Sequence, residues 1–203
     1  KKKKHLVTAN KAMLALHGSK LSTLAHKFNV NLNFEASVAG GIPIINIIQS
    51  SLLSDNIVNL YGILNGTCNY ILSQMLEKKI SFDKALKDAQ EKGFAELDPY
   101  DDISGTDTAY KLLILSNLVF GTNEKITSVY KEGIEGIESI DLEMAEKLGY
   151  SVTLLGITNI KKKFIQFRVH PCLVPKNSII AKVKNELNTV IIEADMSDKT
   201  VII

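Results

Sequence analysis

VTLLGITNI, residues 152–160, opens the part of the chain that decides the fold. Two similar runs follow it, KFIQFRVHPCLV at 163–174 and NTVIIEADM at 188–196, and the chain ends within KTVII at 199–203. Such runs, rich in β-branched and aromatic residues, are typical of strands that follow one another in antiparallel order. We therefore expect a largely antiparallel sheet from Val152 onward.

Working back from this sheet, the first 151 residues alternate a few short strands with longer helices. Strand patterns occur at 5–11, at 29–38, where Val30, Leu32 and Phe34 alternate, and at 56–64. Helical periodicity and caps predict helices at 11–28, 42–53, 65–79, 81–93, 105–121 and 141–151. Pro43 suits a helix start and Ser81 a helix cap. The pattern predicts an α/β protein of the α+β type, with helices packed on a mixed sheet.

Composition excludes several classes of protein. The 24 basic residues nearly balance the 22 acidic ones, so the net charge of +2 gives no electrostatic reason to expect nucleic acid or an acidic membrane as partner. No apolar run approaches the length of a bilayer span and no signal-peptide order is seen, so we expect a cytoplasmic protein. Cys68 and Cys172 lie far apart without a CxxC pair, which indicates neither a zinc site nor a disulfide framework.

A cluster of carboxylates lies in GFAELDPYDDISGTDTAYK, residues 93–111. Asp107 and Lys111 are four residues apart on a predicted helix, so their side chains share a face and can pair. The loop before them carries four more acids, Glu96, Asp98, Asp101 and Asp102. Three uses fit this pattern: a solvated loop with helix capping, a site for an organic substrate that carries an ammonium group, or a divalent metal site.

Lys11 and two glycine turns are further candidates. Lys11 follows a strand, and the carboxyl ends of strands are where α/β proteins bind ligands. The turns VAGGIP (38–43) and NGT (65–67) each lead into a helix and offer free amides to an anion. No GxGxxG or GxxxxGK[ST] motif occurs, so a complete dinucleotide or nucleoside-triphosphate site is not encoded here. The four histidines form no ligand spacing.

Five segments, in this order, closely resemble the homoserine dehydrogenase family. They are VTANKA (7–12), FEASVAGGIPII (34–45), GILNGTCNYIL (62–72), KGFAELDPYDDISGTDTAYKLLIL (92–115) and LGYSVTLLGI (148–157). The resemblance implies the interconversion of L-aspartate 4-semialdehyde and L-homoserine with NADPH or NADH, at the branch toward threonine, methionine and isoleucine. It also implies a Rossmann domain followed by a substrate domain that forms a homodimer.

Compared with that architecture, residues 1–40 are expected to be the C-terminal end of the Rossmann domain. Residues 41–203 are expected to be the substrate-binding, catalytic and dimerisation domain, truncated at its C-terminus. We expect this fragment to be inactive alone, because the glycine-rich cofactor fingerprint is absent from it. Two alternatives stay open: a non-catalytic dimerisation module, and a related two-domain dehydrogenase that acts on another amino-acid semialdehyde.

The resemblance also implies roles for single residues. Lys111 would donate the proton to the carbonyl oxygen and Asp107 would orient it. The amino end of the substrate would be bound by Glu96 and Asp102, with Asp101, Gly66 and Thr67 nearby. Lys11 would lie where cofactor and substrate meet, preceded by the cofactor-contacting residues Thr8, Ala9 and Asn10. A sodium ion would be held, mainly by main-chain oxygens, at Glu35, Val38, Gly40 and Ile42. Cys68 stands where the family commonly has threonine.

Overall fold

The structure is a computed structural model that describes residues 3–52, 55–161 and 164–203. Its main feature is a six-stranded sheet in the order β4-β6-β5-β3-β7-β8. These strands are β3 (Ile57–Ile63), β4 (Val129–Lys131), β5 (Tyr150–Lys161), β6 (Phe164–Pro175), β7 (Thr189–Ala194) and β8 (Asp198–Ile202). All neighbours are antiparallel except β4 and β6, which run parallel. The predicted mixed, largely antiparallel sheet is confirmed.

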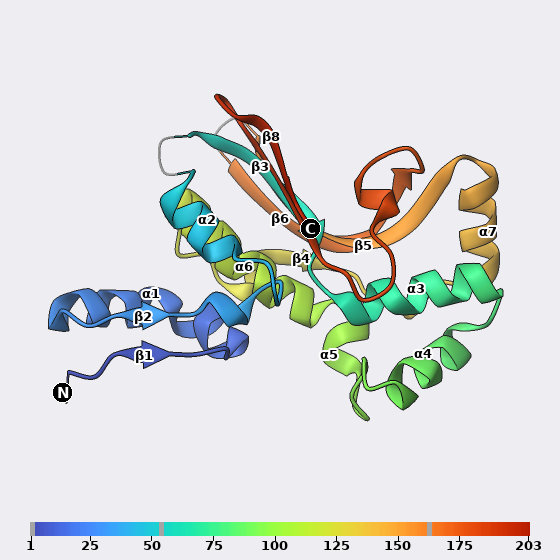
Figure 1. The fold of residues 1–203 in the computed structure, drawn as a ribbon, viewed down its shortest axis with the longest axis horizontal. Helices are drawn as coiled ribbons and strands as arrows, with labels where there is room; N and C mark the ends of the chain where they lie inside the picture. Colours follow the sequence, from blue (N-terminus) through green and yellow to red (C-terminus); the bar gives the residue numbers. More distant parts are fainter. Residues whose placement is uncertain (1–2, 53–54, 162–163) are drawn as a thin grey trace.

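Helices lie on one face of this sheet (Figure 1). Those that make the main contacts with its strands are α3 (Gly66–Lys78), α6 (Thr106–Phe120) and α7 (Ser139–Lys147). The others pack mainly on these helices: α4 (Phe82–Glu91) on α3, α5 (Tyr100–Ile103) on α3 and α6, and α2 (Ile44–Ser50) on α6. The core between the layers includes Leu60 and Ile192 from the sheet and Leu112 from α6, none of which is exposed. Burying each such side chain stabilises the fold by about 1.5–3 kcal/mol.

The contact between α6 and β5 is especially close. A Cβ added at Gly156 of β5 would lie 3.1 Å from the Leu64 side chain and 3.3 Å from those of Leu112 and Thr108. The glycine therefore lets α6 approach the sheet, and it fixes the depth at which the first turn of α6 lies. No helix among the residues that the structure describes is long and apolar enough to cross a bilayer.

The N-terminal segment forms a separate two-stranded parallel sheet, β1 (Leu6–Val7) and β2 (Leu32–Asn33), joined by α1 (Lys11–Phe28). Asn10 caps α1 by accepting a hydrogen bond from the amide of Met13 at 2.9 Å. Asn29 ends the helix in the left-handed conformation, with φ of 50°. Helix α1 lies against α6 (Figure 1), so the start of α1 meets the start of α6.

Several predicted boundaries are wrong, each for a local reason. The strand predicted at 29–38 is only Leu32–Asn33, followed by a 3₁₀ turn, η1 (Glu35–Ser37), because the Glu35 carboxylate bonds to the amides of Ile45 and Asn46 at the start of α2. The helix predicted at 42–53 spans Ile44–Ser50, and residue 53 lies outside the described residues. The helix predicted at 141–151 ends at Lys147, because Gly149 has a φ of 84°. The elements α5, β4, η2 (Ile126–Ser128) and η3 (Ile180–Lys182) were not predicted.

Candidate active site between α1, α3 and α6

The first turn of α6 carries a buried carboxylate between two lysines. Asp107 is 1% exposed, and its two oxygens lie 2.7 Å from Nζ of Lys11 and 2.8 Å from Nζ of Lys111. The ion pair predicted from the spacing of Asp107 and Lys111 is present. Lys111 also donates a hydrogen bond to the main-chain oxygen of Leu64 at 2.9 Å, so its ammonium group is held from two sides. The α1 and α6 segments therefore meet at a single carboxylate.

Asn65 connects this carboxylate to the rest of the site. It caps α3 by accepting a hydrogen bond from the amide of Cys68 at 2.8 Å. Its amide nitrogen donates to Asp102 at 2.7 Å and to Asp107 at 2.8 Å. Asn65 is 4% exposed, so these bonds are shielded from water. One side chain thus fixes the positions of α3, α5 and α6 relative to each other.

Burial and charge act against each other on the acids. Burial alone would raise the pKa of Asp107, but the charges of Lys111 and Lys11 outweigh it and the pKa is lowered. Burial would likewise lower the pKa of Lys11, but Asp107 raises it above the ordinary value. Asp102 has no direct ion pair with a lysine among the described residues, and its burial raises its pKa despite the bond from Asn65. At neutral pH, Asp107 and Lys11 are therefore charged.

Cys68 lies at the back of this cluster. It is fully buried, and its thiol donates to the main-chain oxygen of Asp102 at 3.2 Å. Burial raises the pKa of this thiol well above its ordinary value, and the nearby carboxylates add to the shift. Because the thiolate is the reactive form of cysteine, Cys68 is a packing residue and not a nucleophile.

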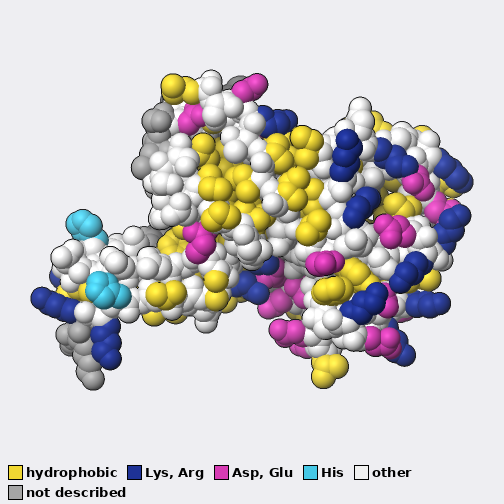
Figure 2. Space-filling view, in the orientation of Figure 1, with side chains coloured by type: hydrophobic (Ala, Val, Ile, Leu, Met, Phe, Trp, Pro, Cys, Tyr) yellow, Lys and Arg dark blue, Asp and Glu magenta, His cyan; other side chains and the backbone are white. Residues whose placement is uncertain are grey.

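The charged groups line an open cleft of about 290 Å³. It is bordered by Lys11, Asn65, Gly66, Thr67, Gly93, Phe94, Asp102, Asp107, Lys111 and Glu186. Figure 2 shows acidic side chains gathered around α5, which borders this region. A Cβ at Gly66 would lie only 2.4 Å from the main-chain oxygen of Glu186, so the loop before β7 rests on the first turn of α3. The cleft offers ammonium and carboxylate groups together, which suits a small zwitterionic molecule.

The cleft brings together most of the predicted site residues: Lys11, Gly66, Thr67, Asp102, Asp107 and Lys111. Glu96 and Asp101 are exposed and do not line it. Thr8, Ala9 and Asn10 form the turn that leads into Lys11, where the Thr8 hydroxyl accepts a hydrogen bond from the Asn10 amide at 3.1 Å. The sequence interpretation assigned no role in the site to Asn65, Phe94 or Glu186. Among these three residues, only Asn65 was indicated by a sequence pattern, because asparagine directly before a helix, as in the NGT turn, is a typical helix cap.

The predicted sodium residues lie near α2, away from the cleft lining. Both Glu35 oxygens accept main-chain amides of α2, at 2.8 and 3.0 Å. Val38 is 1% exposed, and the oxygen of Ile42 accepts a hydrogen bond from the Ile44 amide at 2.8 Å. Within the described ranges, no three His, Cys, Asp or Glu side chains gather as a metal-binding group. A site built mainly from main-chain oxygens, including that of Gly40, stays a prediction.

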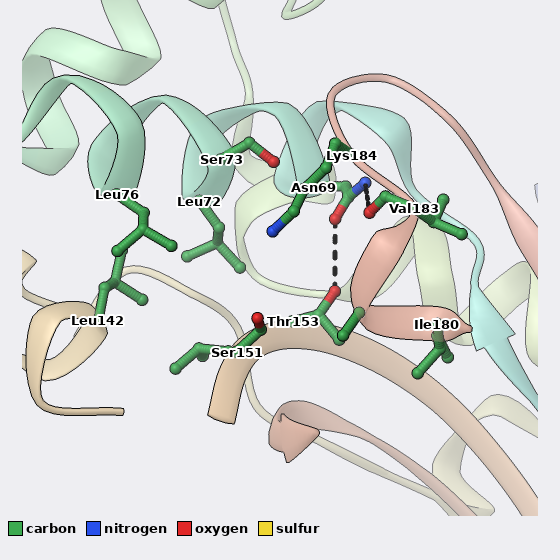
Figure 3. A pocket seen from close by; sticks show the side chains of 12 residues that line it. Asn69, Leu72, Ser73, Leu76, Leu142, Ser151, Thr153, Ile180, Val183 and Lys184 are labelled. Atoms are coloured by element: carbon green, nitrogen blue, oxygen red, sulfur yellow. Dashed lines mark hydrogen bonds between the residues drawn. The ribbon is translucent and has the colours of Figure 1, made fainter. Parts of the chain in front are cut away.

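A smaller pocket lies between α3, β5 and the segment around η3 (Figure 3). Its volume is about 20 Å³, which leaves room for about one water molecule. Asn69 donates to the main-chain oxygen of Val183 at 3.2 Å, and Thr153 donates to Asn69 at 3.4 Å. No Asp or Glu of the described residues lines this pocket, so it lacks the carboxylates that the candidate active site contains. Its bonds hold the segment before β7 on α3, which places Glu186 at the cleft.

The chain is similar to known proteins along nearly its whole length. Residues 43–203 match the family model described as homoserine dehydrogenase. Homoserine dehydrogenase from Neisseria gonorrhoeae is 47% identical over 197 residues, covering 97% of this chain and 45% of that protein. The enzyme of that name from Helicobacter pylori is 47% identical over 199 residues, covering 98% of this chain and 47% of that protein.

A solved structure shows the same fold. The crystal structure of a homoserine dehydrogenase from Thiobacillus denitrificans superposes with a TM-score of 0.95 and 43% identity, covering 98% of this chain and 46% of that chain. The chain thus spans about half the length of these relatives. The family model covers every residue that lines the cleft except Lys11, and the chain belongs to the homoserine dehydrogenase family.

Proposed function

We propose that this chain is the substrate-binding and catalytic part of a homoserine dehydrogenase, which interconverts L-aspartate 4-semialdehyde and L-homoserine in threonine, methionine and isoleucine biosynthesis. In this proposal residues 1–40 belong to the nucleotide-binding domain, residues 41–203 form the substrate domain, and the enzyme works in the cytoplasm. The observation that carries the proposal is the buried carboxylate of Asp107, which binds both Lys11 and Lys111 in a polar cleft.

Lys111 is the proposed proton donor. Reduction of an aldehyde builds negative charge on its oxygen, and a positioned ammonium group both stabilises that charge and supplies a proton. Asp107 and the oxygen of Leu64 bind Lys111 on the side away from solvent, and its side chain is 17% exposed. The ammonium group is thus oriented by the protein and still reachable from the cleft.

The family implies a nicotinamide cofactor, NADPH or NADH, which supplies the hydride when bound. The turn Thr8, Ala9, Asn10 and Lys11 would hold its reactive end. These residues fit that task because Ala9 and Asn10 are exposed and Lys11 belongs both to this turn and to the cleft. The N-terminus of the 18-residue helix α1 adds a partial positive charge at the same place.

Asp102 is the proposed partner of the substrate ammonium group. It lines the cleft, and Asn65 holds one of its oxygens at 2.7 Å. An ammonium group beside Asp102 would favour its ionised form, which burial disfavours. Glu96 and Asp101, the other acids assigned by resemblance, do not line the cleft in this structure, and their part in binding the substrate stays a proposal. Sodium at residues 35–42 is retained as a part of this proposal.

The outer face of the sheet is the proposed contact of a homodimer. The register aligns Ile157, Tyr61, Ile191 and Val201 in a row across four neighbouring strands. Ile191 is buried, whereas Ile157, Tyr61 and Val201 are only partly buried, and Figure 2 shows hydrophobic side chains gathered around the edge strand β8. A second copy of this face would cover the row and remove its apolar side chains from water.

The test is Lys111→Ala in the enzyme that contains this chain and its nucleotide-binding domain. We expect kcat to fall by about 10²–10⁴-fold, the usual contribution of a general acid, with little change in KM. Lys87→Ala is the matched control, because the Lys87 side chain is 76% exposed on α4. Turnover near wild type in Lys111→Ala would refute the assignment.

Three further measurements separate the alternatives. A wild-type protein without activity that still sediments as a dimer would support the non-catalytic dimerisation module. A higher kcat/KM with another amino-acid semialdehyde would support the related dehydrogenase. Residues 1–203 alone should show no stoichiometric NADPH binding in calorimetry, because no glycine-rich fingerprint is present in them.

A further inference from the structure

Helix α4 is attached to α3 by a hydrogen-bonded group outside the cleft. Tyr70 of α3 is 4% exposed, and its hydroxyl donates to Asp88 of α4 at 2.7 Å. Lys92, at the end of α4, donates to the same hydroxyl at 2.6 Å and lies 3.2 Å from Asp88. Lys78 of α3 lies 3.3 Å from Asp88. We call these four residues the Tyr70 cluster.

The Tyr70 cluster lies directly behind one wall of the cleft. Phe94 borders the cleft and packs against the Tyr70 ring in a tilted arrangement, with ring centroids 4.8 Å apart. The main-chain oxygen of Phe94 accepts a hydrogen bond from Thr67 of α3 at 2.7 Å. Thr67 and Tyr70 are three residues apart, so they lie on the same side of α3. The position of Phe94 is therefore set by α3.

The loop after Phe94 depends on α4 in the same way. The amides of Phe94 and Ala95 both donate to the oxygen of Ala89, at 2.9 and 3.2 Å. The side-chain amide of Gln90 donates to the main-chain oxygens of Glu96 and Leu97, at 3.1 and 3.4 Å. Residues 94–97 are thus bonded to α4 as well as to α3, so the way in which α4 packs on α3 affects their position.

We infer that Tyr70 and Asp88 are positioning residues that set substrate affinity by holding the Phe94 wall of the cleft, while leaving the proton transfer at Lys111 unchanged. The inference rests on the proposed function for its kinetic part. Neither residue touches Lys111, Asp107 or Lys11, which are bound to each other and to α3 through other contacts. The geometry therefore separates a binding wall from the reacting groups.

The kinetic test uses Tyr70→Phe in the intact enzyme. This variant keeps the ring that packs against Phe94 and removes the hydroxyl that bonds to both Asp88 and Lys92. We expect KM for the semialdehyde to rise about 3–10-fold, the effect of losing one or two hydrogen bonds, with kcat within twofold of wild type. The KM for the nicotinamide cofactor should not change.

Asp88 supplies a second, independent test. Asp88→Ala should raise KM for the semialdehyde as Tyr70→Phe does, whereas Asp88→Asn should restore part of the affinity, because its amide oxygen still accepts the tyrosine hydroxyl. Glu91→Gln is the matched control, since Glu91 pairs with Lys87 alone in the part of the chain that the structure describes, and its side chain is 67% exposed. A KM unchanged in both Tyr70→Phe and Asp88→Ala, or a parallel fall in kcat, would overturn the inference.

Hydrogen exchange on residues 1–203 gives a readout that needs no activity. The amides of Phe94 and Ala95 should exchange about 3–10-fold faster in Tyr70→Phe, while those of α6 keep their wild-type rates. Unchanged rates in the loop would overturn the positioning role. If the wild-type enzyme were inactive on the semialdehyde, the proposed function would fail, and the exchange rates would still decide whether Tyr70 positions the wall.

Discussion

Replacing Asp107 with asparagine should destabilise the fold strongly, because the carboxylate is buried between two ammonium groups. Its side chain is 2% exposed and it lies 2.7 and 2.8 Å from the two lysine nitrogens. Removing one partner of a buried ion pair typically costs about 3–5 kcal/mol, since a charge is left without compensation. Lys11 is 42% exposed and can turn to water, so its contribution resembles that of a surface pair. The loss should come mainly from Lys111, whose side chain is 17% exposed, and we expect about 3 kcal/mol in total.

Urea unfolding of the wild-type and Asp107→Asn proteins measures this loss. The midpoint should fall with an unchanged m-value, because the surface exposed on unfolding stays the same. The double variant with Lys111→Met should recover part of the loss, giving a coupling energy above about 1 kcal/mol. A loss below about 1 kcal/mol, as for an exposed ion pair, or a coupling near zero would refute the idea that a desolvated ion pair stabilises the site.

The same experiment has a defined pH dependence. The pKa of Asp107 is lower in the folded protein than in the unfolded chain, so the carboxylate stabilises the fold at every pH above its unfolded pKa. This contribution is lost as the pH falls through the lowered, folded pKa. The difference between wild type and Asp107→Asn should therefore be constant from about pH 5 to 8 and shrink below about pH 4.

Three other substitutions test the neighbouring structure. Burial raises the pKa of Asp102 in the folded protein, so the ionised carboxylate destabilises the fold at pH values above its unfolded pKa. Asp102→Asn removes this penalty, so relative to wild type the variant should be more stable at pH 7 than at pH 3, and urea titrations at both pH values check this. Gly66→Ala should cost about 1–3 kcal/mol, because its Cβ would lie 2.4 Å from the Glu186 oxygen. Gly18→Ala, in α1 with nothing within 4 Å of the added Cβ, should instead stabilise by about 0.5–1 kcal/mol, and thermal melts of both glycine variants decide the two signs.

The parts of the fold that depend on local sequence were predictable. The β5–β6 hairpin pairs Tyr150 with Pro175 through to Lys161 with Phe164, as the strand-forming runs indicate. Asn65 in NGT begins α3, and the four-residue spacing of Asp107 and Lys111 gives the ion pair. Each of these features depends on neighbours within a few residues, which a pattern can represent.

The parts that depend on distant contacts were not predictable. Glu35 lies in a strand pattern, but its carboxylate bonds to amides ten and eleven residues away and ends the strand early. Asn65 bridges to Asp102 and Asp107, which are 37 and 42 residues further along the chain. Local spacing carries no information about such pairs. For the same reason Glu96, only six residues from Asp102, does not line the cleft that its neighbour lines.

Asp107 also explains how two segments of the chain make one site. Lys11 comes from the β1–α1–β2 unit and Lys111 from the helical layer, and the same carboxylate binds both. Leu14 of α1 and Ile114 of α6 are both buried in the shared core, so apolar packing brings the segments together and the ion pairs set their register. If residues 1–40 belong to the nucleotide-binding domain, this contact is where cofactor and substrate meet. Asp107 therefore does more than orient Lys111, because the same carboxylate also holds Lys11 at the cleft.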